Sequence, residues 1–220
     1  MKYDAVIFDL DGTLLESTAD RLEWLYTAVE KAIEKFDMES EATELSHREL
    51  GTLAGLEGDE KFREKCMELG LDADRFWFHV SHMRAKEKLH LLDENLLGLV
   101  NGTEEVLEDL RSENISLAVV SNAPDPTVDE VVRFFELDQL LDFFRGITDL
   151  KDFRERKPHP FHLEMAIAEL EADNILYVGD SHVDVIAAEK AGADSVIIGE
   201  DREADFTVEN LTEIPVLIQS

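Results

Sequence analysis

The sequence predicts an α/β fold in which a doubly wound parallel sheet carries an inserted α-helical segment. Short apolar runs alternate with amphipathic stretches through the second half of the chain, a pattern typical of a parallel sheet covered by helices. One further apolar run lies at residues 5–9, and after it the alternation stops until about residue 90. We therefore expect an α/β core of residues 1–14 and 90–220, with residues 15–89 forming an α-helical cap.

Five short apolar runs have the length of buried strands. They are residues 5–9, 116–121, 146–149, 175–179 and 195–199. Between the later runs, apolar residues recur at helical spacing and predict helices at residues 103–112, 126–136, 160–170 and 183–191. Gly192 follows the last of these helices, where glycine is a common C-terminal cap.

The segment from residue 15 to residue 89 shows helical periodicity and no predicted strand. Apolar residues from Leu22 to Phe36 recur three and four positions apart, and Ser17 with Asp20 predicts a capping box before them. Further helices are predicted at residues 47–56, 60–69 and 74–88. An uninterrupted helical insertion of this length is large enough to form a separate cap on the core.

The charge of the chain is strongly negative. It has 51 Asp and Glu against 21 Lys and Arg, for a formal net charge of −30, and the acids recur along the whole sequence. Such a surface repels nucleic acid and anionic lipid, so we expect neither as a partner. The acidity fits either a soluble protein at the acidic end of the usual range or one adapted to a salt-rich cytoplasm, and the size of the excess favours the second.

The single cysteine, Cys66, excludes an intramolecular disulfide and indicates a reducing compartment. The first residues run directly into a strand-like segment without the architecture of a signal peptide, and no apolar run has the length of a membrane span. We therefore expect a cytoplasmic protein.

The first predicted strand ends in two carboxylates. In Asp9-Leu10-Asp11-Gly12-Thr13 the acids are two residues apart, so their side chains point to the same side of an extended chain. Gly12 allows a sharp turn that exposes backbone amides. Acids at this position can also cap a following helix, which is the simpler structural interpretation.

Polar residues also follow three later strands. Ser121 and Asn122 lie at the end of the second, Lys157 beyond the third, and Asp180 and Asp184 after the fourth. Ligands of open parallel sheets bind beyond the carboxyl ends of the strands. Carboxylates gathered there repel by about 4 kcal/mol per pair at 4 Å and an effective dielectric constant of 20. A divalent cation removes this repulsion, and a set of oxygen ligands suits Mg²⁺.

These residues, in this order, resemble the four sequence motifs of the haloacid dehalogenase superfamily. The resemblance covers nearly the whole chain, and the helical insertion after the first motif is most similar to the phosphoglycolate phosphatase and β-phosphoglucomutase branch. It implies a Rossmann-like core with a helical cap. Dehalogenation is disfavoured, because Asp11 occupies an acid/base position that the dehalogenases lack.

The resemblance also implies a role for each motif residue. Asp9 would attack phosphorus and form an aspartyl-phosphate, while Asp11 would act as general acid and base. Lys157 would neutralise negative charge. The phosphoryl group would be bound around Gly12, Thr13, Ser121 and Asn122. Mg²⁺ would be held by Asp9, Asp180 and the backbone carbonyl of Asp11, with Asp184 as a ligand or close neighbour.

The implied function is the Mg²⁺-dependent hydrolysis of a small phosphate monoester, so the expected partner is a small phosphorylated metabolite. Three alternatives keep the same scaffold. They are a sugar-phosphate mutase, a phosphonate hydrolase that uses a cap lysine, and a non-catalytic binding or regulatory protein. The lysines considered for the second alternative are Lys31, Lys35, Lys61 and Lys65.

Selection of the substrate is assigned to the cap, because the four motifs account for only one phosphoryl group. Within the cap, residues 46–51 match the position of a substrate-contacting loop in the resembled branch. Arg48 of this stretch could bind a substrate carboxylate, or it could pair with nearby acids on a solvated helix.

The net charge of −30 predicts that salt stabilises the fold. The Debye length falls to about 3 Å at 1 M salt, so KCl screens the repulsion between surface acids. We expect the melting temperature to rise as KCl is increased from dilute buffer into the molar range. A melting temperature that stays constant or falls would rule out the adaptation to a salt-rich cytoplasm.

Overall fold

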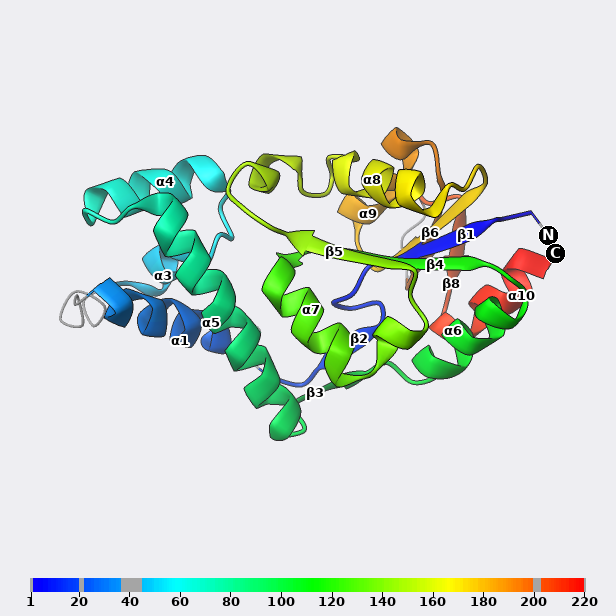
Figure 1. Ribbon diagram of the computed structural model, residues 1–220, viewed down its shortest axis with the longest axis horizontal. Coiled ribbons are helices and arrows are strands. Elements are labelled where there is room, and N and C mark those ends of the chain that lie inside the picture. Colours follow the sequence, from blue (N-terminus) through cyan, green and yellow to red (C-terminus); the bar gives the residue numbers. More distant parts are fainter. Residues whose placement is uncertain (1, 20–21, 37–44, 200–202, 220) are drawn as a thin grey trace.

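The computed structural model describes residues 2–19, 22–36, 45–199 and 203–219. An α/β core and a group of helices at one end of the sheet make up the molecule (Figure 1). This arrangement confirms the predicted fold class. No helix in these described ranges combines the length and apolar character needed to cross a membrane.

A six-stranded parallel sheet forms the centre of the core, in the order β5-β4-β1-β6-β7-β8. The strands are β1 (Ala5–Phe8), β4 (Ser116–Pro124), β5 (Phe143–Ile147), β6 (Ile175–Gly179), β7 (Asp194–Ile198) and β8 (Phe206–Val208). The chain passes from β1 outward through β4 and β5 and then returns to β6 on the other side of β1. The strand order therefore reverses beside β1, which is where doubly wound sheets open a crevice for ligands.

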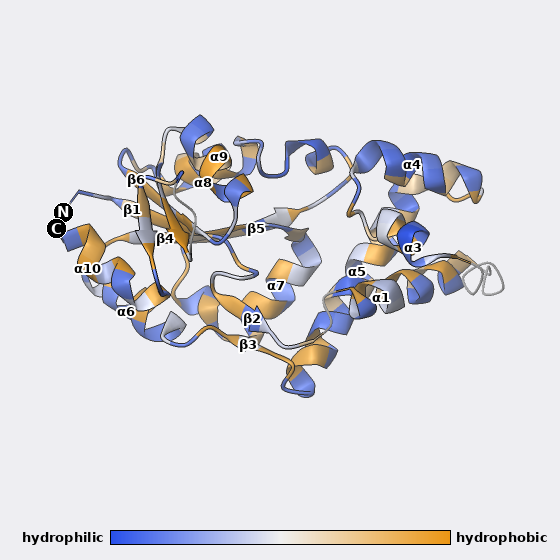
Figure 2. Ribbon diagram, turned by 180° about the vertical axis from the view of Figure 1, so that it is seen from behind, coloured by the Kyte–Doolittle hydropathy of each residue, from blue (hydrophilic) through white to orange (hydrophobic). Residues whose placement is uncertain are grey.

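Helices cover both faces of the sheet (Figure 1). One face packs against α6 (Thr103–Ser112), α7 (Asp125–Phe134) and α10 (Ile214–Gln219), and the other against α8 (Phe161–Leu170) and α9 (His182–Ala191). Alternate residues of β1 face the two layers: Val6 and Phe8 contact the first, Ala5 and Ile7 the second. Central strands buried on both faces are continuously apolar for this reason, and β4 and β6 are strongly hydrophobic in Figure 2.

The second group of helices corresponds to the predicted cap. It contains α1 (Glu23–Ile33), the 3₁₀ turn η1 (Glu34–Phe36), α3 (His47–Leu53), α4 (Asp59–Glu68) and α5 (Ala73–Asp93). Their apolar faces form a separate hydrophobic cluster around Phe62, Phe76 and Trp77. Ile147, Leu150 and Phe153, from the core part of the sequence, belong to the same cluster. The cap and core therefore share apolar packing on this side.

Two short strands connect the cap to the core. β2 (Leu15–Ser17) pairs antiparallel with β3 (Leu97–Leu99). The expectation of no strand between residues 15 and 89 was therefore wrong, because a three-residue strand is too short to show a periodic pattern. Helix α5 continues to Asp93, so the expected division between residues 89 and 90 falls inside a helix.

Other predictions also need correction. The capping box predicted from Ser17 and Asp20 is not formed by Ser17, which lies in β2 and donates a hydrogen bond to the Leu96 carbonyl, 3.2 Å away. Helix α1 begins after Leu22 without a side-chain cap, and Asp20 lies outside the described residues. The strand predicted at residues 146–149 begins earlier, at Phe143, and β8 was not predicted. Both are edge strands with partly exposed residues, so their apolar pattern is weak.

Candidate active site

A cavity of about 570 Å³ lies at the carboxyl ends of the central strands. Its core side is lined by Asp9, Ser121, Lys157 and Asp180, and its cap side by residues of α1, α5 and the α3–α4 connection. Asp9 follows β1, Ser121 lies within β4, Lys157 precedes α8 and Asp180 follows β6. These residues are brought together because parallel strands end at one edge of the sheet. The four sequence motifs thus converge on this cavity.

Asp9 is a buried carboxylate at the end of β1. Its Oδ1 accepts a hydrogen bond from the Leu10 amide at 2.7 Å and lies 2.8 Å from Lys157 Nζ. Burial raises the pKa of Asp9 to about 7, although the Lys157 ammonium acts in the opposite direction. One oxygen is therefore fixed in place by two donors at the edge of the cavity.

Lys157 is held by several groups at once. Its Nζ lies 2.6 Å from Asp184 Oδ1 and 2.7 Å from the hydroxyl of Tyr177, which is fully buried. Burial lowers the pKa of Lys157, but the carboxylates of Asp9 and Asp184 outweigh this effect and the net shift is upward. Lys157 therefore remains an ammonium ion inside the protein.

Asn122 positions the backbone of this lysine. Its side-chain amide donates to the Lys157 carbonyl at 2.9 Å and its side-chain carbonyl accepts from the Lys157 amide at 2.8 Å. Asn122, which was expected to bind phosphate, also lines the cavity, and its side-chain amide has a second N–H that these two bonds do not use. Tyr177 was not predicted as a site residue, because a tyrosine inside an apolar strand resembles ordinary core.

Three carboxylates form a compact acidic cluster. Asp9, Asp180 and Asp184 each offer an oxygen, and these oxygens lie within 4.8 Å of one another. Asp184 is buried in the first turn of α9, where it accepts hydrogen bonds from Ser181. Such a set of oxygen ligands, partly compensated by one ammonium, suits Mg²⁺. The residues present therefore fit the expected metal, with Asp9 and Asp180 nearest to the cavity.

Asp11 lies apart from this cluster. Its carboxylate forms an ion pair with Lys88 on α5, whose side chain is only 4% exposed. The Lys88 ammonium also lies 5.9 Å from the centre of the Trp24 ring. Lys88 continues the helical spacing of the predicted cap helix, so the sequence did not distinguish it from a surface lysine. This ion pair is a direct polar contact between the cap and the first motif.

The small residues of the motifs have different surroundings. Ser121 lines the cavity; its hydroxyl oxygen accepts from the Ala123 amide at 3.1 Å and can still donate its own proton. Gly12 also lines the cavity, and its amide donates to the Leu15 carbonyl at 2.8 Å. Thr13 is fully buried and is not among the residues that line the cavity.

Arg48 does not reach the cavity. Its side chain is 80% exposed on α3 and lies 3.5 Å from Glu57. The stretch around it forms the capped start of α3, where Ser46 and Glu49 bond each other reciprocally. Of the two interpretations of Arg48, the structure therefore agrees with pairing to a nearby acid.

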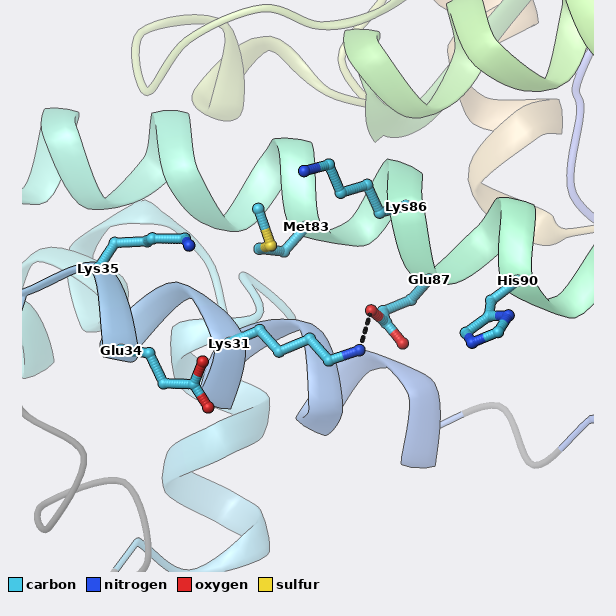
Figure 3. A pocket seen from close by; sticks show the side chains of 7 residues that line it. All are labelled: Lys31, Glu34, Lys35, Met83, Lys86, Glu87 and His90. Atoms are coloured by element: carbon cyan, nitrogen blue, oxygen red, sulfur yellow. Dashed lines mark hydrogen bonds and ion pairs between the residues drawn. The ribbon is translucent and has the colours of Figure 1, made fainter.

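The four lysines considered for a phosphonate hydrolase also lie elsewhere. Lys31 and Lys35 line a separate hollow between α1, η1 and α5, where Lys31 pairs with Glu87 at 2.7 Å (Figure 3). Lys61 pairs with Glu57, and Lys65 pairs with Glu49 and Glu68. Among the described residues, the lysines that line the main cavity are Lys88 and Lys157.

Residues 6–198 match the family model described as haloacid dehalogenase-like hydrolase. The chain belongs to this family. A phosphoglycolate phosphatase of Aliivibrio fischeri is 31% identical over 195 residues, covering 86% of this chain and 81% of that protein. A second, from Cereibacter sphaeroides, is 30% identical over 187 residues, covering 85% and 81%.

Two solved structures share the fold. The structure of CbbY from Rhodobacter sphaeroides in complex with phosphate has a TM-score of 0.67 at 18% identity and covers 96% of each chain. A predicted phosphoglycolate phosphatase from Haemophilus somnus has a TM-score of 0.63 at 22% identity, covering 100% of this chain and 99% of its own. The resemblance inferred from the motifs is confirmed, and the protein is a phosphatase of this superfamily.

Gly12 is expected to be irreplaceable for two separate reasons. Its φ of +89° is unfavourable for other residues, and an added Cβ would lie 2.2 Å from Asp180 Oδ2. Gly12→Ala should therefore displace Asp180 and abolish most phosphatase activity. Gly70→Ala is the matched control, because Gly70 has a φ of +70° and no atom lies within 4 Å of the position that an added Cβ would occupy.

Measurement of unfolding free energy and of turnover separates the two effects. Gly70→Ala should lose about 1–2 kcal/mol of stability, the cost of a left-handed conformation, with normal turnover. If Gly12→Ala keeps normal turnover like this control, the close approach of Asp180 to the backbone at Gly12 has no functional importance.

Proposed function

We propose that the protein hydrolyses a small phosphate monoester through an aspartyl-phosphate on Asp9, with Mg²⁺ as cofactor. The observation that carries this proposal is the position of Asp9: a buried carboxylate at the cavity edge, 2.8 Å from the Lys157 ammonium and grouped with Asp180 and Asp184. The relatives named phosphoglycolate phosphatase support a substrate resembling phosphoglycolate.

In the first step, the Asp9 oxygen attacks phosphorus and the bond from phosphorus to the leaving-group oxygen breaks. Asp11 donates a proton to that oxygen. In the second step, water attacks the phosphorus of the aspartyl-phosphate and gives a proton to Asp11, which releases inorganic phosphate and restores Asp9. Both residues line the cavity, as do Lys157, which would neutralise the phosphoryl oxygens, and Ser121, whose hydroxyl would bind them.

Lys88 suits the second step of this cycle rather than the first. Its ammonium contacts the Asp11 carboxylate, and the ionised carboxylate is the form that accepts a proton from water. Because Lys88 is on α5 and Asp11 is in the core, the contact forms only while the cap lies against the core as in this structure.

The metal would be held by Asp9, Asp180 and the backbone carbonyl of Asp11. When bound, Mg²⁺ supplies positive charge that orients the phosphoryl group and stabilises the charge of the transition state. Asp184 uses one oxygen for Lys157 and Tyr177 and the other for Ser181, so its main contribution is to position its neighbours.

A sugar-phosphate mutase would use the same core residues. A different substrate is suggested by one relative at 23% identity, which is named a pyrophosphatase, PpaX. A phosphonate hydrolase is less well supported, because Lys31, Lys35, Lys61 and Lys65 do not line the main cavity. The lone Cys66 is buried among apolar residues, which agrees with a structural role. A cytoplasmic location remains part of the proposal.

Asp9→Asn should abolish turnover of small phosphate monoesters without changing the fold, because an amide is a very poor nucleophile. Asp11→Asn should lower turnover by about 10²–10⁴-fold, the usual contribution of general acid–base catalysis. Release of inorganic phosphate measures both, with circular dichroism as the test of folding. Asp129→Asn, an exposed acid paired with Arg133, is the control.

A substrate with a very good leaving group, such as an aryl phosphate, should restore the first step in Asp11→Asn but not in Asp9→Asn. Substantial turnover by folded Asp9→Asn protein would falsify the covalent mechanism.

Removal of the metal should silence the enzyme. We expect EDTA to abolish activity and excess Mg²⁺ to restore it, since uncompensated carboxylates at the cavity repel the substrate phosphate. Asp180→Ala should raise the Mg²⁺ concentration needed for half-maximal activity about tenfold or more, the scale on which even supporting residues affect metal affinity. Full activity with verified negligible metal content would exclude the proposed carboxylate site.

A further inference from the structure

Two arginines lie in the wall of the main cavity without a carboxylate partner. Arg84 on α5 and Arg156 in the loop before Lys157 both line it, and neither forms an ion pair with any described residue. Six of the seven other described arginines pair with acids, as expected in a chain with 51 acids and 21 basic residues: Arg48, Arg63, Arg111, Arg133, Arg145 and Arg154. The seventh, Arg75, lies against the Phe36 ring, 4.9 Å from its centre.

Neighbouring carbonyls hold the two guanidinium groups. Arg84 Nη1 donates to the Ala54 carbonyl at 3.1 Å, and Arg156 Nη1 donates to the next carbonyl, that of Gly55, at 3.0 Å. The Phe153 ring lies against Arg156, with its centre 4.6 Å from the guanidinium carbon. Both groups are therefore fixed at the turn between α3 and α4, one from the cap and one from the core.

These contacts leave donors unused and charge uncompensated. Arg84 Nε is buried and has no hydrogen-bond partner in the described part of the chain. Burial lowers the pKa of Arg84 to about 10; the Asp11 carboxylate opposes this, and Arg156 adds to it. Burial also lowers the pKa of Arg156. Both arginines are thus still charged at neutral pH. Asp11 acts on Arg84 and Asp59 acts on Arg156 through their charge, but neither carboxylate forms an ion pair with its arginine.

We propose that Arg84 and Arg156 are specificity-determining residues that together bind a second anionic group, carried by the leaving group of the substrate. A guanidinium presents a planar set of donors that matches a carboxylate or a phosphate. Lys157, Ser121 and Mg²⁺ already account for the transferred phosphoryl group, so the anion held by the arginines belongs to the other end of the molecule. The substrate class is a small phosphate monoester with a carboxylate or second phosphate, and this refinement rests on the proposed function.

The test compares substrates that differ only in the second group. Suitable probes are 2-phosphoglycolate, which carries a carboxylate, ethane-1,2-diyl bisphosphate, which carries a second phosphate, and 2-hydroxyethyl phosphate, which carries neither. Wild-type kcat/KM should favour at least one anionic probe over the neutral probe by about tenfold or more, and the better anionic probe distinguishes a carboxylate from a phosphate partner.

Arg84→Gln and Arg156→Gln should each reduce that preference by about tenfold, and by up to a hundredfold, the scale of hydrogen bonds to charged groups. Turnover of the neutral probe should change less than threefold. Glutamine can still donate to the Ala54 or Gly55 carbonyl, so the fold is expected to persist. Arg84→Lys, which keeps the charge but not the planar set of donors, should recover part of the preference.

Arg48→Gln and Arg154→Gln are the matched controls. Arg48 is also on a cap helix, Arg154 is two residues before Arg156, and both are exposed and paired with acids. Neither control should change the preference. An equal loss on charged and neutral probes in the Arg84 and Arg156 variants would overturn the proposal, since it would place these residues at the transferred phosphoryl group.

Binding to the folded Asp9→Asn protein gives a second measurement that does not depend on turnover. Calorimetry should show tighter binding of 2-phosphoglycolate or the bisphosphate than of 2-hydroxyethyl phosphate, and Arg84→Gln should remove this difference. If the wild type hydrolyses all three probes equally well, the second anion site is wrong and the phosphatase proposal stands. If it hydrolyses no monoester, the proposed function itself fails.

Discussion

The contact on which the site depends is the Lys157 ammonium between two buried carboxylates. It lies 2.8 Å from Asp9 and 2.6 Å from Asp184, and the Tyr177 hydroxyl completes its surroundings. Removing either partner would leave buried charge uncompensated, which costs several kcal/mol. Because Asp9 follows β1 and Asp184 lies in the first turn of α9, this one group also fixes the end of the sheet relative to a helix of the outer layer.

The surrounding backbone serves the same arrangement. Asn122 holds Lys157 through both of its main-chain groups, and Gly179 lacks a side chain where a Cβ would lie 2.5 Å from Asp184. Asn122 and Gly179 belong to β4 and β6, two central strands of the sheet. The cap side contributes cations on long side chains, from Lys88 and Arg84. Under the proposed function, the core would bind the constant phosphoryl group, and the cap cations together with Arg156 of the core would bind the variable remainder of a substrate.

The sequence predicted the parts of this structure that are under the strongest physical constraint. Strands β1, β4 and β6 were located because burial on both faces makes them continuously apolar, whereas the partly exposed edge strands β5 and β8 were misplaced or missed. Asp9, Lys157 and Asp180 were brought to one place by topology alone. Lys88, Arg84 and Tyr177 could not be recognised, since each fits the pattern of its helix or strand and only tertiary packing shows what it faces. Arg48 was considered as a substrate-binding residue because its position in the chain does not reveal that it pairs with Glu57.

The β2–β3 ribbon brings the two ends of the insertion together, with Leu15 opposite Leu99. A segment that leaves and re-enters a domain at adjacent points leaves the rest of the domain's path unchanged, and lengthening it costs little closure entropy. The core can therefore accept inserted segments of different size and shape at this position while its own strands keep their register. What restricts such exchange is the apolar contact on the other side, where Ile147, Leu150 and Phe153 need a cover. A change of cap must keep apolar side chains packed over these three residues. New substrate specificity is therefore more readily acquired by substitutions in the cavity wall than by substitutions in this apolar contact between cap and core.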